Sequence, residues 1–314
     1  MTSSNPQRIF ITGATGHIGT ALTSLALSHS HTVRALSRTP ASDAALLALG
    51  ATPVRGDLTT LTTLRSESSA ADTVLHLATA YTFGQGTYES VRATDTAALD
   101  AIAAALAGTD KPLVVTSGTL VVTADPSGRE TTESSHAEVN PLNTRLLTEQ
   151  HALQLAARGI RVTALRMPPY VYGHGRSGVA QFMDTFAHAG VVSVIDGGHN
   201  RTTAAHVDDV AALYLLAAER GRAGEVYNAG ASTDVTMREL SEAMADVLGV
   251  AVRDLSKDEA GEQFGPGLTY FLSVENRASG GKAMRELGWK PKELGILEDI
   301  RTGSYVDVAR GLKK

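Results

Sequence analysis

The chain has 314 residues, of which 43% are hydrophobic and 19% charged, so it can bury a sizeable core and global disorder is excluded. Lys and Arg number 28 against 33 Asp and Glu, a formal net charge of −5, and we therefore expect no nucleic-acid partner. The absence of cysteine excludes thiolate catalysis, disulfides and thiolate zinc sites. Without an apolar signal core or a run of the ~18 apolar residues that a membrane span needs, we expect a soluble, cytoplasmic protein with no membrane partner.

The first half of the chain alternates short β-branched runs with Ala- and Leu-rich stretches, which is typical of βαβ units on a parallel sheet. The pattern predicts strands at residues 8–12, 31–36, 52–55, 73–77, 112–116 and 161–166. It predicts helices at residues 18–28, 43–49, 93–107 and 144–157. We therefore expect an α/β fold, a doubly wound parallel Rossmann sheet with right-handed crossovers.

The alternation loosens after residue 166, where a turn-rich segment precedes helices predicted at residues 180–189, 207–219 and 237–248. We expect residues 1–168 to form mainly the Rossmann domain. Residues 169–314 should form mainly a smaller C-terminal substrate lobe, with some segments returning to the first domain. The polar stretch at residues 125–140 is predicted to be a surface loop.

A glycine-rich turn separates the first strand from the first helix, with the sequence Thr12-Gly-Ala-Thr-Gly-His-Ile-Gly19. Glycines lack a Cβ atom, which permits a tight turn and a close approach of backbone to a pyrophosphate. The helix that follows offers free N–H groups and a positive dipole end to phosphate. This context favours nucleotide binding over a merely structural turn, with cofactor contacts expected from Gly13, Thr15, Gly16, His17, Ile18 and Gly19.

The end of the second strand indicates which dinucleotide is bound. A carboxylate usually stands there to bind the ribose hydroxyls of NAD, but this chain has Ser37 and Arg38. Because a guanidinium suits a 2′-phosphate, NADP is the predicted cofactor, although Arg38 could be an ordinary solvated side chain. Asp57 could accept a hydrogen bond from adenine or could cap its own loop. Further cofactor contacts are expected from Leu58, Leu77, Ala78 and Thr79.

Several motifs occur in the order seen in one enzyme group: the glycine turn, Gly56-Asp-Leu58, Val74-Leu-His-Leu-Ala78, Arg166-Met-Pro-Pro-Tyr-Val-Tyr-Gly173, His206-Val-Asp-Asp-Val210, Tyr227-Asn-Ala-Gly230 and Leu287-Gly-Trp289-x-Pro291. The chain thereby resembles the extended short-chain dehydrogenases/reductases, the group of NAD-dependent epimerases, dehydratases and ketoreductases. The resemblance implies an NAD(P)-binding Rossmann domain with a C-terminal lobe, a cofactor contact at Pro168, a small-molecule substrate and a possible homodimer.

The catalytic positions depart from this group. Such enzymes use a Ser or Thr with a Tyr-x-x-x-Lys pair, in which lysine lowers the tyrosine pKa. The positions that resemble the pair hold Pro141 and Arg145, and the serine position aligns with Gly118. The chain therefore looks like an atypical member that lacks the pair, with Ser117 and Thr119 as the neighbouring hydroxyls.

Other side chains must then carry the chemistry. Arg145 is permanently charged, so it can bind ribose hydroxyls or an oxyanion, or it can be a surface arginine. Tyr81, just past the fourth strand, is the first candidate proton donor, although it could instead line an apolar pocket. Ser117 and Thr119 are candidate hydrogen-bond donors, and Tyr172 or its neighbour Tyr170 could replace the missing phenol.

The histidines give weaker predictions. His76 should be a hydrogen-bonded core residue, and His174 a solvated one rather than a proton relay. The His206-Val-Asp-Asp209 motif should cap a helix, so we predict no metal site. No Gly-x-Ser-x-Gly elbow occurs, which argues against a serine hydrolase.

These features predict an NADPH-dependent reductase of a small or medium ketone, aldehyde or imine. The alternatives are an epimerase or dehydratase, and a catalytically silent NADPH-binding sensor.

Overall fold

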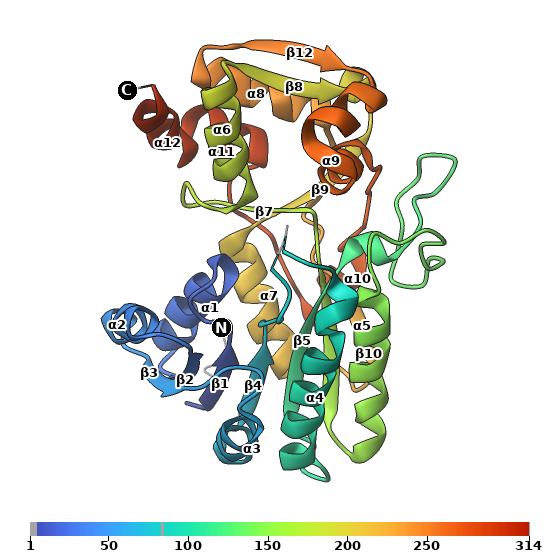
Figure 1. Ribbon diagram of the computed structural model, residues 1–314. Helices are drawn as coiled ribbons and strands as arrows, with labels where there is room; N and C mark the ends of the chain where they lie inside the picture. Colours follow the sequence, from blue (N-terminus) through green and yellow to red (C-terminus); the bar gives the residue numbers. More distant parts are fainter. Residues whose placement is uncertain (1–4, 83–84, 314) are drawn as a thin grey trace.

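The computed structural model describes residues 5–82 and 85–313, and its main element is a parallel seven-stranded sheet (Figure 1). The strand order is β10-β6-β5-β4-β1-β2-β3, so the order reverses between β1 and β4, where such sheets form a ligand crevice. The strands are β1 (Arg8–Thr12), β2 (Thr32–Ser37), β3 (Thr52–Arg55), β4 (Thr73–His76), β5 (Pro112–Gly118), β6 (Arg161–Met167) and β10 (Glu225–Asn228).

Helices cover both faces of this sheet. Because side chains alternate along a strand, Ile9 and Ile11 of β1 pack on one face and Phe10 on the other. The first face is covered by α1 (His17–Ser28), α2 (Pro40–Leu49), α7 (Val207–Arg220) and α10 (Gly281–Leu287). The second is covered by α3 (Leu61–Ala70), α4 (Tyr88–Leu106) and α5 (Arg145–Gln154). The doubly wound Rossmann prediction is confirmed.

In the described residues, two smaller sheets and five further α-helices complete the fold, with short 3-10 helices at Thr119–Val121, Leu155–Arg158 and Asp196–Gly198. The first sheet contains β7 (Tyr170–Tyr172), β9 (Arg201–His206) and β11 (Ser232–Thr236), and the second contains β8 (Val191–Ile195) and β12 (Ala251–Leu255). The helices are α6 (Ser177–Ala189), α8 (Met237–Leu248), α9 (Lys257–Ser273), α11 (Ile296–Thr302) and α12 (Tyr305–Leu312). These helices and the β8–β12 sheet, here called the upper body, share one hydrophobic cluster and lie at the top of Figure 1.

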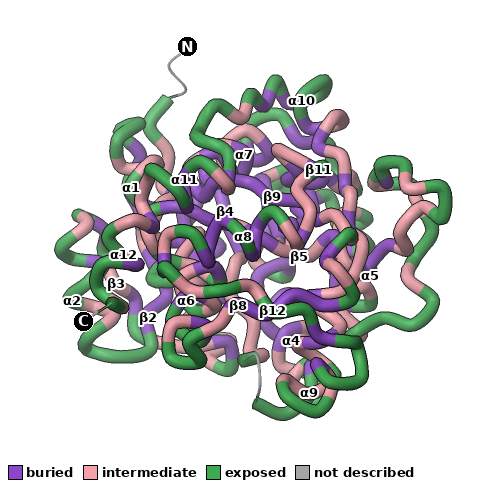
Figure 2. The backbone as a smooth tube through the Cα atoms, turned by 90° about the horizontal axis from the view of Figure 1, so that it is seen from above, coloured by how far each residue is buried: buried purple, intermediate pink, exposed green. Residues whose placement is uncertain are grey.

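The two parts are joined by several segments. β10, at residues 225–228, pairs with β6 at the edge of the main sheet. The predicted loop at residues 125–140 is largely exposed, but Thr131 is buried and pairs with Ala278. Figure 2 shows β4, β5 and α7 buried inside the outline, whereas most of α2 is exposed at the rim. None of the helices in the described residues is long and apolar enough to cross a membrane.

Candidate active site

The glycine turn forms a cradle that leaves no room for side chains. Gly13 has φ +77°, and a Cβ atom there would lie 3.0 Å from the Ala78 nitrogen. A Cβ atom on Gly19 would lie 2.1 Å from the Gly13 oxygen. Gly16 begins α1 without a side-chain cap, so no side chain takes up the N–H groups of the first turn. This uncapped helix end beside glycine backbone fits the pyrophosphate of a dinucleotide.

The end of β2 carries the predicted selectivity residues. Ser37 is buried, and its hydroxyl donates to the Thr39 carbonyl at 3.3 Å. Arg38 is exposed at the strand end, and no carboxylate in the described chain lies within ion-pair distance of it. The guanidinium is therefore available to a phosphate.

Asp57, after β3, caps its own loop. Its Oδ1 accepts hydrogen bonds from the Thr59 amide at 2.8 Å and the Thr59 hydroxyl at 2.6 Å. These bonds hold the pKa of the Asp57 carboxyl below its usual value. The loop-capping alternative is therefore confirmed for this oxygen, while Oδ2 takes no part in these bonds. The adenine contact remains a prediction.

A buried carboxylate that the sequence did not single out as functional fixes the loop after β4. Asp95 of α4 accepts hydrogen bonds from the Thr79 hydroxyl at 2.6 Å and from the Ala80 amide at 2.7 Å. The Thr79 hydroxyl proton is therefore already engaged. The same loop carries Tyr81, whose half-buried ring packs edge-on against Tyr88 at a centroid distance of 5.8 Å.

A cleft of about 500 Å³ opens at the end of β5. Gly118, Thr119, Arg145 and Pro168 are among its described lining residues, whereas Ser117 is not. The Thr119 hydroxyl donates to Asn276 Oδ1 at 3.0 Å. The Ser117 hydroxyl is buried and has no hydrogen-bond partner among the described residues. Of the two predicted hydroxyl residues, Thr119, directly after β5, is therefore the one in the wall of the cleft, although its side chain is fully buried.

Arg145, the first residue of α5, is held against the sheet. Its Nη2 donates to the Thr116 carbonyl at 2.5 Å, and its guanidinium carbon lies 5.5 Å from the centroid of the Tyr88 ring. The Tyr88 hydroxyl donates to Thr148 Oγ1 at 2.9 Å, and burial raises the Tyr88 pKa. The alternative of a solvated surface arginine is therefore wrong, because the positive charge is fixed at the edge of the cleft.

The hydroxyls of the two β7 tyrosines are held by contacts inside the fold. Residues two apart on a strand share one side, and here both side chains are buried. The Tyr172 hydroxyl donates to the Leu294 carbonyl at 2.6 Å, and the Tyr170 hydroxyl contacts the Met237 sulfur at 3.5 Å. Burial raises both pKa values. Tyr172 is therefore a poor proton donor, and its prediction as catalytic is corrected.

His76 confirms its predicted role in the core. It is 5% exposed and forms a hydrogen bond of 2.9 Å with the Thr12 hydroxyl. Burial lowers its pKa to about 4, so the ring is neutral near neutral pH.

The His206-Val-Asp-Asp209 motif caps α7 as predicted. His206 Nδ1 accepts from the Asp208 amide, and Asp209 accepts from the amides of Lys292 and Glu293. His174 is exposed, with its Nε2 3.0 Å from Asp208 Oδ1. Ligand atoms of His174, His206 and Asp208 lie within 4.8 Å of one another, although capping already engages His206. The expectation of no metal remains a prediction.

Comparison with known families agrees with this geometry. The model of the NAD dependent epimerase/dehydratase family matches residues 9–230, which include the glycine cradle, Arg145 and β10. The chain belongs to this family. Membership explains the order of the sequence motifs and makes the chain one of a group of NAD(P)-binding oxidoreductases.

Relatives within and around the family show its range. An uncharacterized protein of Schizosaccharomyces pombe is 35% identical, over 95% of this chain and 99% of its own length. A 4-hydroxy-2-methyl-3-oxo-4-farnesyl-3,4-dihydroquinoline-1-oxide ketoreductase of Stigmatella aurantiaca is 27% identical, over 77% of this chain and 74% of its own. The structure of a dTDP-glucose 4,6-dehydratase from Streptomyces venezuelae with NAD bound superposes with TM-score 0.76 at 22% identity, covering 97% of each chain. That likeness supports the fold.

Proposed function

We propose that this protein is an NADPH-dependent reductase of a small or medium ketone, aldehyde or imine. The observation that carries the proposal is the pairing of a glycine cradle, free of side chains, with a cleft that has a fixed cation, Arg145, at its edge. The ketoreductase relative supports the reaction class, since its name gives reduction of a ketone.

The choice of NADP over NAD rests on the end of β2. Gly13, Gly16, Gly19 and the first turn of α1 would hold the pyrophosphate, and Arg38 would hold the 2′-phosphate. No carboxylate at the end of β2 repels that phosphate, because Ser37 and Arg38 stand there. When bound, NADPH supplies the hydride for the carbonyl or imine carbon, and the proton for the oxygen or nitrogen must come from the chain or from water.

The chain's own residues divide the remaining work. Arg145 places a guanidinium at the edge of the cleft, which would stabilise negative charge on the substrate oxygen and is a poor proton donor. Thr119 lies in the wall of the cleft, but it is fully buried and its hydroxyl donates to Asn276, so it supports the wall and is not a free proton donor. Tyr81 remains the first candidate proton donor.

The missing Tyr-x-x-x-Lys pair supports a reductase over an epimerase or dehydratase. None of the eight tyrosines in the sequence is followed by lysine four positions later. A reductase can rely on positioning and a single proton donor, whereas epimerisation and dehydration depend more on a tyrosine base. The missing pair also keeps a silent NADPH-binding sensor as the second candidate.

The test combines cofactor binding with turnover. NADPH should bind in calorimetry and raise the melting temperature, and a panel of ketones, aldehydes and imines should oxidise it. Tyr81→Phe should lower kcat by about 100-fold, as loss of a general acid does, without changing the NADPH Kd. Arg145→Ala should lower kcat/KM by at least about tenfold, since one preorganised charge is lost.

A tyrosine far from the cleft provides the control. Tyr227→Phe, on the edge strand β10, removes a hydroxyl of the same kind and should leave turnover unchanged. NADPH binding with no turnover on the whole panel would favour the sensor, and no binding of either coenzyme would overturn both candidates.

A further inference from the structure

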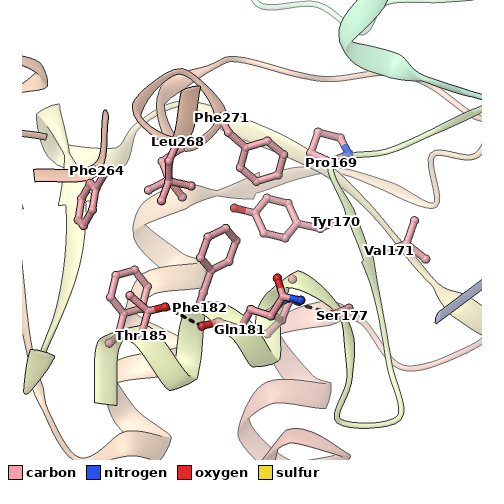
Figure 3. Close-up of a pocket in the computed structure, with 14 residues that line it drawn as sticks. Pro169, Tyr170, Val171, Ser177, Gln181, Phe182, Thr185, Phe264, Leu268 and Phe271 are labelled. Atoms are coloured by element: carbon pink, nitrogen blue, oxygen red, sulfur yellow. Dashed lines mark hydrogen bonds between the residues drawn. The ribbon is translucent and has the colours of Figure 1, made fainter. Parts of the chain in front are cut away.

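An apolar cavity of about 340 Å³ lies between the upper body and β7, beyond the catalytic cleft (Figure 3). Phe182 of α6, Phe271 of α9 and Tyr170 form a cluster of three rings, with centroid distances of 6.3 Å and 5.6 Å from Tyr170 and 6.1 Å between the two phenylalanines. Phe264 and Leu268 of α9 extend the wall. The cavity volume is in the range of ~300–1,000 Å³ that is typical of small-molecule sites.

The lining chemistry excludes charged ligands. The described residues around this cavity include no Asp, Glu, Lys, Arg or His. Phe182, Phe264 and Phe271 line the cavity and are only partly buried, so part of their apolar surface remains uncovered. When a ligand removes such apolar surface from water, the free energy of the complex falls, which favours binding.

The cavity adjoins the cleft at the end of β5. Pro169 and Phe271 line both spaces, so only these side chains are shared between them. A molecule whose reacting carbonyl lies beside Arg145 would have to extend past Phe271 to reach the apolar space. The two adjoining spaces then offer a polar end and an apolar end.

The charges of the cleft do not suit a nucleoside diphosphate. Among the described residues lining the cleft, the charged side chains are those of Glu138 and Arg145. Arg145 already donates to the Thr116 carbonyl, and Glu138 would repel a phosphate. Two adjacent phosphates need several cations or N–H donors, and the two spaces together do not provide them.

We infer that the substrate is a neutral carbonyl or imine compound with a bulky apolar substituent, an aromatic ring system or a branched hydrocarbon, which occupies this cavity. The inference rests on the proposed reductase function and makes it more specific. Binding of the substituent is driven by burial against Phe182, Phe264 and Phe271, and the reacting group remains in the cleft.

The test uses the full chain with acetylnaphthalene as a bulky neutral ketone, acetone as a small one and UDP-glucose as a nucleotide sugar. In calorimetry acetylnaphthalene should bind the NADPH complex, whereas UDP-glucose should not bind. In turnover, kcat/KM should be at least tenfold higher for acetylnaphthalene than for acetone.

Variants of the cavity wall separate this site from a general effect on folding. Leu268→Trp fills the cavity and should lower the ratio of kcat/KM for acetylnaphthalene over acetone at least tenfold. Phe271→Ala removes the shared wall and should weaken acetylnaphthalene binding at least tenfold, with the NADPH Kd as the measure of intact folding. Leu47→Ala, on the exposed face of α2, is the control and should change neither value.

The outcomes distinguish the two proposals. Binding of acetylnaphthalene that depends on Phe271 but leads to no NADPH oxidation would support the apolar site and contradict the reductase. Oxidation of NADPH by acetone with no binding of acetylnaphthalene, or tight binding of UDP-glucose, would overturn the apolar site and leave the reductase standing.

Discussion

Arg38 is the residue on which the choice of coenzyme depends. It lies exposed at the end of β2, where a guanidinium can form charge-assisted bonds with a 2′-phosphate that are stronger than its bonds with neutral ribose hydroxyls. Arg38→Ala should therefore raise the NADPH Kd at least about tenfold, since hydrogen bonds to charged groups contribute ~1.5–3 kcal/mol. The NADH Kd should change less than about twofold. Calorimetric titration of both coenzymes measures the difference.

A neighbouring arginine tests whether position or charge matters. Arg55, at the end of β3, is engaged in an ion pair with Asp43, so Arg55→Ala should leave the preference for NADPH intact. Ser37→Asp should in turn move the preference toward NADH, because a carboxylate repels the phosphate and accepts from ribose hydroxyls. Equal losses of both coenzymes in Arg38→Ala would contradict the assignment.

At the scale of elements, a buried ion pair ties α5 to β6. Arg166 Nη2 lies 2.6 Å from Glu149 Oε1, and Arg166 Nε lies 2.9 Å from Glu149 Oε2, with side chains that are 7% and 2% exposed. Removing one partner leaves an unpaired buried charge, so Arg166→Met should lower the free energy of unfolding by about 3–5 kcal/mol. Urea unfolding measures the change.

The double variant Arg166→Met with Glu149→Leu should recover much of this loss, because no charge then remains buried. The exposed pair Arg310–Asp307 of α12 gives the control, and Arg310→Met should cost less than about 1 kcal/mol. If the single variant at Arg166 behaved like the one at Arg310, the pair would not be the link between α5 and β6.

The elements differ in how far the sequence predicts them. The sequence predicts β1 and β3 with their observed bounds, and β1 contains a continuous apolar run from Ile9 to Ile11. Helix α3 was missed because Leu64 and Ser68 are its buried residues in an otherwise polar, β-branched segment. β7 has only three residues, and the burial of its Tyr172 depends on contacts with residues far away in the sequence, such as Leu294, so no local pattern predicts it. The apolar cavity depends on such long-range packing and has no local pattern.

The candidate site also contains local features that the sequence predicts and long-range contacts that it does not. The glycine cradle is local, and its fit to a pyrophosphate follows from adjacent residues. The placement of Arg145 depends on its contacts with Thr116 and Tyr88, which lie 29 residues upstream along the chain or further. Sequence spacing gave the identity of this residue but not whether it is exposed, because α5 must first pack on the sheet.

At the scale of the whole molecule, buried neutral histidines control stability at mildly acidic pH. The pKa of His76 is about 4 in the folded state and near 6.5 when unfolded, so between these values the unfolded chain binds a proton that the folded chain does not. Stability is therefore present above pH 6.5 and is lost as the pH falls toward 4. The difference corresponds to about 3 kcal/mol, and His17, whose pKa is also lowered to about 4, acts in the same direction.

The carboxylates act in a separate, more acidic window. Hydrogen bonds lower the pKa values of Asp57 and Glu67, so their contribution is lost only as the pH falls below their ordinary values near 4. Urea unfolding of His76→Gln between about pH 4 and about pH 7 should show a smaller loss of stability than that of the wild type. The slope of the free energy of unfolding against pH should fall by an amount that corresponds to at most one bound proton. His188→Gln, at an exposed position of α6, should keep the wild-type slope. An unchanged slope in His76→Gln would assign the acid sensitivity to other groups, His17 first among them.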